Sequence, residues 1–213
     1  LPILAEYALS QSDPQVWQEQ LRSIAQSQER ASHLVDQLLA LALAQEAQQV
    51  LQPQPLALDE VVRDSLMRHL HRADALGVDL GAVGLDKPVW IAAQRALLEG
   101  VLDNLIDNAM RYGLPPAGQQ RHVTVALARL PEGDLELSVV DNGPGISDAQ
   151  RERLLQRWAQ GSAGEALKQG SGLGLSIVAE YARIMGTPLS LGPGHAGQGL
   201  KVGLRFAAQP SVG

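Results

Sequence analysis

The sequence of 213 residues predicts an α+β fold, in which helices cover one face of a sheet, with a separate helical segment in front. Residues 1–52 carry only helical patterns. The remainder mixes helices and strands without the regular alternation of a parallel α/β protein. We therefore predict a helical domain over residues 1–52, a linker over 53–55 and a second domain over 56–213.

A long helix is predicted over residues 14–49. Ser12 and Pro14 are typical of a helix start. Apolar residues then recur with heptad spacing 4-3-4-3, interrupted once by Gln28. The seam consists of Trp17, Leu21, Ile24, Gln28, Ala31, Val35, Leu38 and Ala42. A narrow seam favours partner helices, with residues 3–9 as the end of the first, so we predict a hairpin that dimerises as a four-helix bundle. The alternative is a helix packed on its own domain.

Pro53-Gln54-Pro55 ends this helix, and the elements that follow can be taken in order. Strands are predicted at residues 56–58, 78–83, 89–92, 123–129, 135–140, 189–191 and 200–206. Helices are predicted from Asp59, as its cap, to about 76, over 93–112, from Ser147 to about 157, and over 173–185. Residues 161–170 form a loop of small residues.

Composition limits the possible partners. The net charge is −6 and the isoelectric point is about 5.3, so we expect no broad nucleic-acid surface. There is no cysteine, which excludes disulfides and thiolate metal sites. No apolar run reaches the ~20 residues that span a bilayer, and no signal peptide is visible. Because the sequence opens at Leu1 without methionine, we expect a soluble fragment of a longer protein.

The first of three motifs spans residues 103–112. Asn104 and Asn108 lie at i and i+4 and therefore share one helix face. A carboxamide oxygen is a hard, neutral ligand that suits Mg²⁺, an ion that shares its ligands with substrate phosphates. Arg111, within one turn, could meet a phosphate. The alternative is a polar surface face of an amphipathic helix.

The second motif, residues 141–146, follows an apolar strand. An ionised Asp141 only accepts hydrogen bonds, for example from the exocyclic amine of adenine. Gly143 and Gly145 leave room beside a flat ligand. The alternative is an ordinary Asp-Asn-Gly turn.

The third motif, residues 170–176, is a glycine loop that opens a helix. The backbone N–H groups of such a helix start favour anions such as phosphate. No lysine follows the last glycine, so this is not the Gly-Lys-Ser/Thr loop, and the spacing is not that of a dinucleotide fingerprint. The alternative is a flexible turn before a helix.

The order and spacing of the three motifs resemble the ATP-binding domain of sensor histidine kinases, within the superfamily of gyrase, MutL and the ninety-kilodalton heat-shock chaperone. Residues 104–112 look like the N box, 141–146 like the G1 box and 170–176 like the G2 box. Residues 153–158 resemble the F box, with Trp158 where phenylalanine is usual. The resemblance covers residues 56–207 and implies a Bergerat-type two-layer α/β sandwich with a mixed sheet. Residues 14–49 resemble the second helix of the dimerisation and phosphotransfer hairpin.

The resemblance also implies the ligands, ATP and Mg²⁺, and the residues that bind them. Asn108 would hold the Mg²⁺, and Asn104 would support the metal and the triphosphate. Asp141 would accept from the adenine amine. The remaining nucleotide-binding residues implied are Arg111, Tyr112, Gly143, Gly145, Ile146, Arg157, Lys168, Gly170, Gly172, Leu173 and Gly174.

The implied function is that of a sensor histidine kinase core, which transfers the γ-phosphate of ATP to a histidine for relay to a response-regulator aspartate. The acceptor histidine of the family precedes an acidic residue, and none of the five histidines, His33 included, does so. We therefore expect that histidine upstream of Leu1. The full protein is expected as a homodimer in the bacterial inner membrane, with this region in the cytoplasm. The alternatives are an ATPase or serine kinase of the superfamily acting on another protein, or a nucleotide-binding scaffold without turnover.

Overall fold

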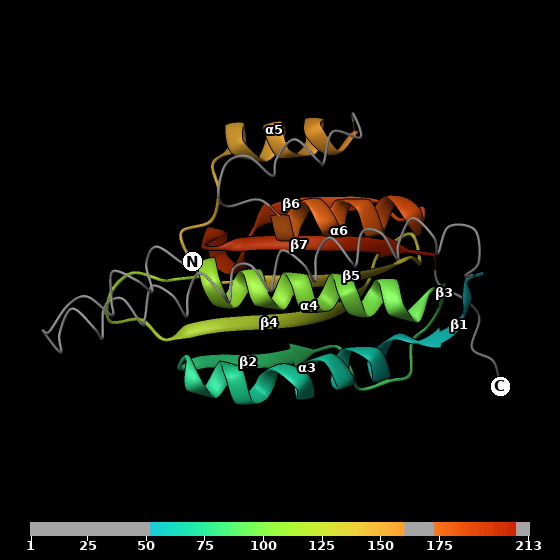
Figure 1. Cartoon of the computed structure of the whole chain (residues 1–213), viewed down its shortest axis with the longest axis horizontal. Coiled ribbons are helices and arrows are strands. Elements are labelled where there is room, and N and C mark those ends of the chain that lie inside the picture. The colour runs from blue at the N-terminus through green and yellow to red at the C-terminus, as the bar shows by residue number, and fades with distance from the viewer. Residues whose placement is uncertain (1–51, 160–172, 208–213) are drawn as a thin grey trace, which may run out of the picture. The chain divides into compact units, whose positions relative to one another are not determined.

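The structure is a computed structural model that describes residues 52–159 and 173–207 (Figure 1). The chain divides into two compact units, Leu1–Leu43 and Ala44–Gly213, and every described residue belongs to the second. The predicted hairpin with its heptad seam, His33 and the 161–170 loop lie outside the described residues.

A five-stranded sheet with the order β2-β4-β5-β7-β6 forms one layer of the second unit. Its strands are β2 (Val78–Val83), β4 (Arg121–Arg129), β5 (Leu135–Asp141), β6 (Leu189–Pro193) and β7 (Leu200–Phe206). β2 and β4 are parallel and the other pairs are antiparallel, so the sheet is mixed, as predicted. The predicted strands lie within two residues of these bounds.

Three helices form the other layer, and Figure 1 shows them running along one face of the sheet. They are α3 (Leu58–Ala75), α4 (Arg95–Tyr112) and α6 (Leu173–Ile184). Alternate residues of β4 and β5, such as Val125 and its partner Val139, are buried beneath them. The opposite face carries polar side chains, among them the ion pair of Glu136 and Lys201. This one-sided burial explains the predicted two-layer architecture.

Close packing of α4 against α6 depends on a glycine. A Cβ atom at Gly100, in the middle of α4, would lie 2.7 Å from the buried ring of Tyr181 on α6. At the far end of the pair, Gly174 of α6 meets Asn108 of α4. The two helices therefore run antiparallel, and the first turn of α6 lies beside the C-terminal half of α4.

Arg121, at the start of β4, joins the C-terminal ends of α3 and α4. Its guanidinium donates to the backbone oxygen of Leu76 at 3.1 Å and to that of Met110. The last carbonyl groups of a helix lack partners within the helix, and a cation there also favours the helix dipole. Arg121 thus fixes the end of α4, where the first motif lies.

The start of the second unit differs from the prediction. β1 (Gln54–Ala57) pairs with β3 (Trp90–Ala93), so Gln54 and Pro55 of the predicted linker lie in a strand. The predicted cap at Asp59 is wrong, because α3 begins at Leu58 and its first turn has no side-chain cap. Asp59 instead accepts hydrogen bonds from the backbone N–H of Val89 and from Arg63.

The other helix starts are nearer to prediction. α4 begins at Arg95 rather than residue 93, because Ala93 still pairs in β3. Ser147 caps α5 (Asp148–Ala159) as predicted: its hydroxyl accepts from the backbone N–H of Gln150, whose side-chain oxygen accepts from the backbone N–H of Ser147. Among the described helices, none is long and apolar enough to cross a membrane.

Candidate nucleotide-binding site

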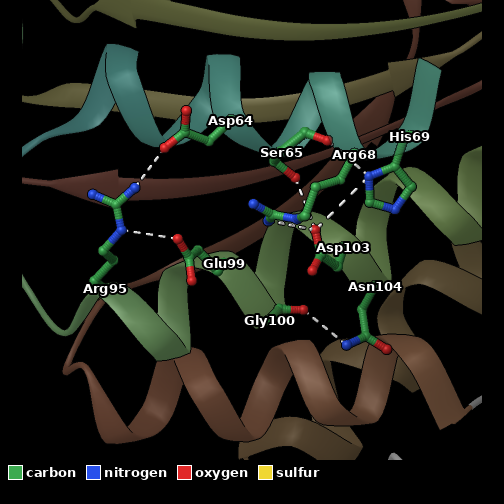
Figure 2. Close-up of polar contacts among 9 residues, drawn as sticks. All are labelled: Asp64, Ser65, Arg68, His69, Arg95, Glu99, Gly100, Asp103 and Asn104. Carbon is green, nitrogen blue, oxygen red and sulfur yellow. Dashed lines mark hydrogen bonds and ion pairs between the residues drawn. The ribbon is translucent and has the colours of Figure 1, made fainter.

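The two amides of the first motif lie one turn apart on α4, on the side away from α3. Figure 2 shows Asp103 pointing toward α3 and Asn104 pointing away from it. The Nδ2 of Asn104 donates to the backbone oxygen of Gly100 at 2.8 Å, whereas its Oδ1 is buried without a partner in the described part of the chain. The Nδ2 of Asn108 is also buried without a partner there.

Buried polar atoms without partners are costly, at about 1–3 kcal/mol each, and therefore need an explanation. Two of them on neighbouring turns of one helix, both from amides of the predicted site, indicate a place where a polar ligand completes the hydrogen bonding. An amide can turn either its oxygen or its nitrogen toward that ligand.

The third motif meets the first at Gly174. A Cβ atom there would lie 2.3 Å from Nδ2 and 2.7 Å from Oδ1 of Asn108, so no other residue leaves the amide in place. The start of α6 therefore lies directly beside Asn108. Its first backbone N–H groups favour an anion at this position. Leu173 begins α6, while Gly170 and Gly172 lie outside the described residues.

Asp141 ends β5 on the helix-facing side of the sheet, because it pairs with Val123 in register with the buried residues. Its Oδ1 accepts from the backbone N–H groups of Gly143, at 2.8 Å, and Leu200, at 3.3 Å. Burial raises the pKa of Asp141, and those two N–H groups act against the increase. No described residue donates to Oδ2, so that oxygen can accept a hydrogen bond from a ligand.

Glycines surround Asp141 and allow the chain to close tightly around it. A Cβ atom at Gly113, just after α4, would lie 2.7 Å from the Cβ of Asp141. One at Gly199 would lie 1.8 Å from the Asp141 backbone oxygen, and Gly199 also has a φ of +80°. Gly143 packs on Gly113, and Gly145, with a φ of +68°, packs on Gly199. Gly143 and Gly145 were predicted to leave room beside a flat ligand, and the structure shows that they also allow close packing of the backbone.

Gly113 and Gly199 are absent from the sequence-predicted site. Gly199 has a signal in the sequence, since Gly197-Gln198-Gly199 directly precedes the last strand. Gly113 has only its place after the helix, where glycine is common for other reasons. Their part in the site depends on contacts with Asp141 that the chain order does not indicate.

Asn142 has a structural task beside Asp141. Its Oδ1 accepts from the backbone N–H of His122, and its Nδ2 donates to the backbone oxygen of Gln120, both at 2.8 Å. These bonds fix the second motif to the start of β4. The alternative interpretation, an ordinary turn, therefore describes Asn142 but does not explain the glycine packing around Asp141.

The acidic residues of the first motif face α3. Asp107 is buried, with 8% of its surface exposed, and pairs with Arg72 of α3 and, at 3.4 Å, with Nε of Arg111. Asp103 accepts from Ser65 and Arg68 of α3. The alternative interpretation of this motif as a polar surface face is wrong for Asp107 and for the buried amide atoms.

The remaining predicted residues are placed as follows. Arg111 and Tyr112 occupy the last turn of α4, and the Tyr112 side chain is exposed. Ile146 lies in the turn before α5, and Arg157 belongs to α5. Lys168 lies outside the described residues. The structure therefore brings together Asn104, Asn108, Gly174 and the end of α4 with Asp141, Gly143 and Gly145.

The donor set fits a magnesium ion that is shared with a ligand. Among the described residues, no three His, Cys, Asp or Glu side chains cluster as a metal site. An ion here would take an amide oxygen of Asn108 and draw its other ligands from phosphates and water, which is the usual situation for Mg²⁺. The unpartnered amide atoms of α4 are consistent with this chemistry.

Comparisons with known proteins agree with this geometry. Residues 93–210 match the family of histidine kinase-, DNA gyrase B-, and HSP90-like ATPases. Sensor protein QseC of Escherichia coli is 30% identical over 189 residues, which are 89% of this chain and 40% of QseC. Sensor protein kinase PmrB of Pseudomonas aeruginosa is 30% identical over 198 residues, which are 93% of this chain and 40% of PmrB.

A solved structure is similar over most of the chain as well. Full-length ShkA in complex with AMPPNP is 26% identical, with a TM-score of 0.65 over 91% of this chain and 40% of ShkA. The chain spans 40% of the length of QseC and of PmrB. The family match covers more than half of the residues, and the described parts of the three motifs lie around α4, so the chain belongs to the histidine kinase-, DNA gyrase B- and HSP90-like ATPase family.

Proposed function

We propose that this chain is the catalytic core of a sensor histidine kinase, which binds Mg-ATP and transfers the γ-phosphoryl group to a histidine for relay to a response-regulator aspartate. The contact of Gly174 with Asn108 is the observation that carries the proposal, because it joins an anion-binding helix start to an amide suited to a metal. The names of QseC and PmrB as sensor proteins support the histidine kinase over other family members.

The base end of the site is Asp141. Its Oδ1 is held by two backbone N–H groups, so Oδ2 accepts from the exocyclic amine of adenine. Gly143, Gly145 and Ile146 lie beside the ring in this proposal. A fixed acceptor in a half-buried position selects adenine, because guanine presents a carbonyl oxygen there and leaves two acceptors opposed.

The phosphate end is the C-terminal half of α4 with the start of α6. Asn108 holds Mg²⁺, Asn104 and Arg111 bind the triphosphate, and Tyr112 flanks it. The N–H groups at Leu173 and Gly174 approach phosphate oxygens, together with those of Gly170 and Gly172. Arg157 and Lys168 reach the γ-phosphate. Bound Mg²⁺ supplies charge neutralisation on the phosphate oxygens. Catalysis then consists mainly of positioning.

Three further parts of the proposal concern the full-length protein. None of the five histidines here precedes an acidic residue, so the acceptor is a histidine outside this sequence. Residues 1–50 form the homodimer, on the evidence of the heptad seam. The full-length protein is a sensor of the bacterial inner membrane with this region in the cytoplasm, by analogy with sensor proteins QseC and PmrB.

The first prediction concerns Asn108 and magnesium. Asn108→Ala should weaken Mg-ATP binding about tenfold or more, the effect of losing ~1.4 kcal/mol, while unfolding in urea stays near native. Calorimetric titration with Mg²⁺ and with a chelator measures this. Chelation should weaken ATP binding in the native chain and have little further effect on the variant. An Asn108→Ala variant that is folded and binds Mg-ATP normally would contradict the assignment.

The second prediction concerns base selection. Asp141→Ala should lose most affinity for ATP and most preference for ATP over GTP in competition titrations. Asp134→Ala is the control, because Asp134 pairs with Arg205 at the β4–β5 turn. Because burial raises the pKa of Asp141, its carboxylate takes up a proton at a higher pH than an ordinary aspartate, whose pKa is ~3.9. As the pH is lowered, adenosine affinity should therefore begin to fall while the pH is still above that value. Equal binding of ATP and GTP by the native chain would exclude this role.

The third prediction concerns the reaction. With γ-labelled ATP, the full-length protein should acquire an acid-labile label on histidine, and the 213-residue chain should not. His33→Gln should leave both results unchanged, because His33 lacks an acidic neighbour that could orient an imidazole. Stoichiometric label on the shorter chain that disappears in His33→Gln would overturn the location of the acceptor. Label on serine of another protein would instead favour the serine kinase.

The fourth prediction concerns assembly. Leu21→Glu with Leu38→Glu should convert the dimer to a monomer in light scattering, because two charges enter the heptad seam. Gln26→Glu with His33→Glu adds two carboxylates to the same helix away from the seam and should leave the dimer intact. The same mass for native and Leu21/Leu38 variant would refute this interface.

A further inference from the structure

Polar pairs join α3 to α4 at successive turns of α3. Figure 2 shows two of these groups, Asp64 with Arg95 and Asp103 with Arg68, Ser65 and His69. The next turn pairs Arg72 of α3 with Asp107 of α4. The α3 members of this row are thus residues 64, 68 and 72, each four residues from the last.

The Arg72 pair differs from the others because its carboxylate is shared with the phosphate end of the site. Oδ1 of Asp107 contacts a terminal nitrogen of Arg72, while Oδ2 lies 3.4 Å from Nε of Arg111. The Asp107 side chain is only 11% exposed. One buried carboxylate therefore lies between a cation of α3, outside all three motifs, and the cation proposed to bind phosphate.

We propose that Arg72 is a positioning residue for the nucleotide phosphates: by occupying one oxygen of Asp107, it limits the hold of that carboxylate on Arg111. This inference rests on the proposed function. Because two arginines share one carboxylate, Asp107 holds Arg111 less tightly than it would in a pair of its own, and a phosphate that approaches Arg111 competes with a weaker contact.

Removal of Arg72 acts on phosphate binding in two ways, and both have the same sign. The local charge falls by one unit, which lowers the attraction for a triphosphate. Without Arg72, Asp107 holds Arg111 more strongly, in surroundings where a paired charge is separated only at considerable cost. Removal of Asp107 would not be as informative, because loss of a negative charge and loss of positioning oppose each other.

Arg68 provides a matched control for the experiment. It lies one turn before Arg72 on the same helix, pairs with an aspartate of α4 and has a side chain 43% exposed against 40% for Arg72. Arg68→Gln and Arg72→Gln therefore remove the same charge from the same row. Asp103, the partner of Arg68, lies one turn further from Arg111 along α4.

The measurements are calorimetric titrations with Mg-ATP and with adenosine. Arg72→Gln should weaken ATP binding about three- to tenfold, Arg68→Gln less than about twofold, and neither should change adenosine binding, since Asp141 is untouched. Arg72→Lys should restore most of the affinity. In an Arg111→Gln background the effect of Arg72→Gln should fall to the less than about twofold expected of Arg68→Gln, because the part transmitted through Arg111 is lost and only the charge difference remains.

Equal effects of Arg72→Gln and Arg68→Gln, or an Arg72 effect that stays three- to tenfold without Arg111, would overturn the inference while leaving the proposed function intact. A native chain that fails to bind ATP would remove both. If Arg72→Gln alone unfolds, Arg72→Gln combined with Asp107→Asn is used. This double variant should bind ATP with near-native affinity, because it has no carboxylate at residue 107 to compete with phosphate for Arg111. A loss of about threefold or more would contradict the inference.

Discussion

The close approach of α6 to α4 is the constraint on which the site depends. At Gly100 and at Gly174, a single added carbon atom would collide with Tyr181 and with Asn108, respectively. Packed interiors leave no space for such an atom, and overpacking typically costs about 1–3 kcal/mol. The glycines therefore fix the separation of the two helices. That separation places backbone N–H groups of α6 beside an amide of α4.

The α4 helix has two functions, which are carried by neighbouring residues on different faces. Asp103 and Asp107 face α3 and bind it through ion pairs and a serine, while Asn104 and Asn108 face away and remain incompletely hydrogen-bonded. Adjacent residues on a helix point about 100° apart, so the two tasks do not interfere sterically. They are coupled electrostatically at Asp107, where the α3 contact and Arg111 meet on one carboxylate.

Asp141, the proposed acceptor for the base, is a partly buried carboxylate with a fixed orientation. Burial disfavours its charged form, and two backbone N–H groups on Oδ1 offset part of that cost and fix its orientation. Gly113 and Gly199 allow the end of α4 and the start of β7 to approach it. The base end of the proposed site is thus preorganised by backbone rather than by long side chains, an arrangement that reduces the entropy lost when a ligand binds.

The element types of the described residues could be predicted from the sequence, because periodicity and turn residues are local signals. The sequence predicted the β4–β5 pair, the cap at Ser147 and helix α6, and it identified three motifs by their residue types and spacing. It failed at Asp59 and at Gln54, where a cap and a linker were predicted. The carboxylate of Asp59 and the pairing of β1 with β3 satisfy backbone groups that are distant in the chain. A local sequence pattern cannot predict such long-range contacts.

Tertiary structure alone decided which residues share the site and which support it. Gly113 and Arg72 have ordinary sequence contexts, and they, like Gly199, acquire their importance from contacts with Asp141 and Asp107. Asp103 and Asp107 have the same spacing as Asn104 and Asn108, so spacing does not distinguish the two pairs. The packing of α3 against one face of α4 shows that the aspartates hold the two helices together. The physical reason is that hydrogen bonds, ion pairs and close packing act over a few ångströms in space, whatever the separation in sequence.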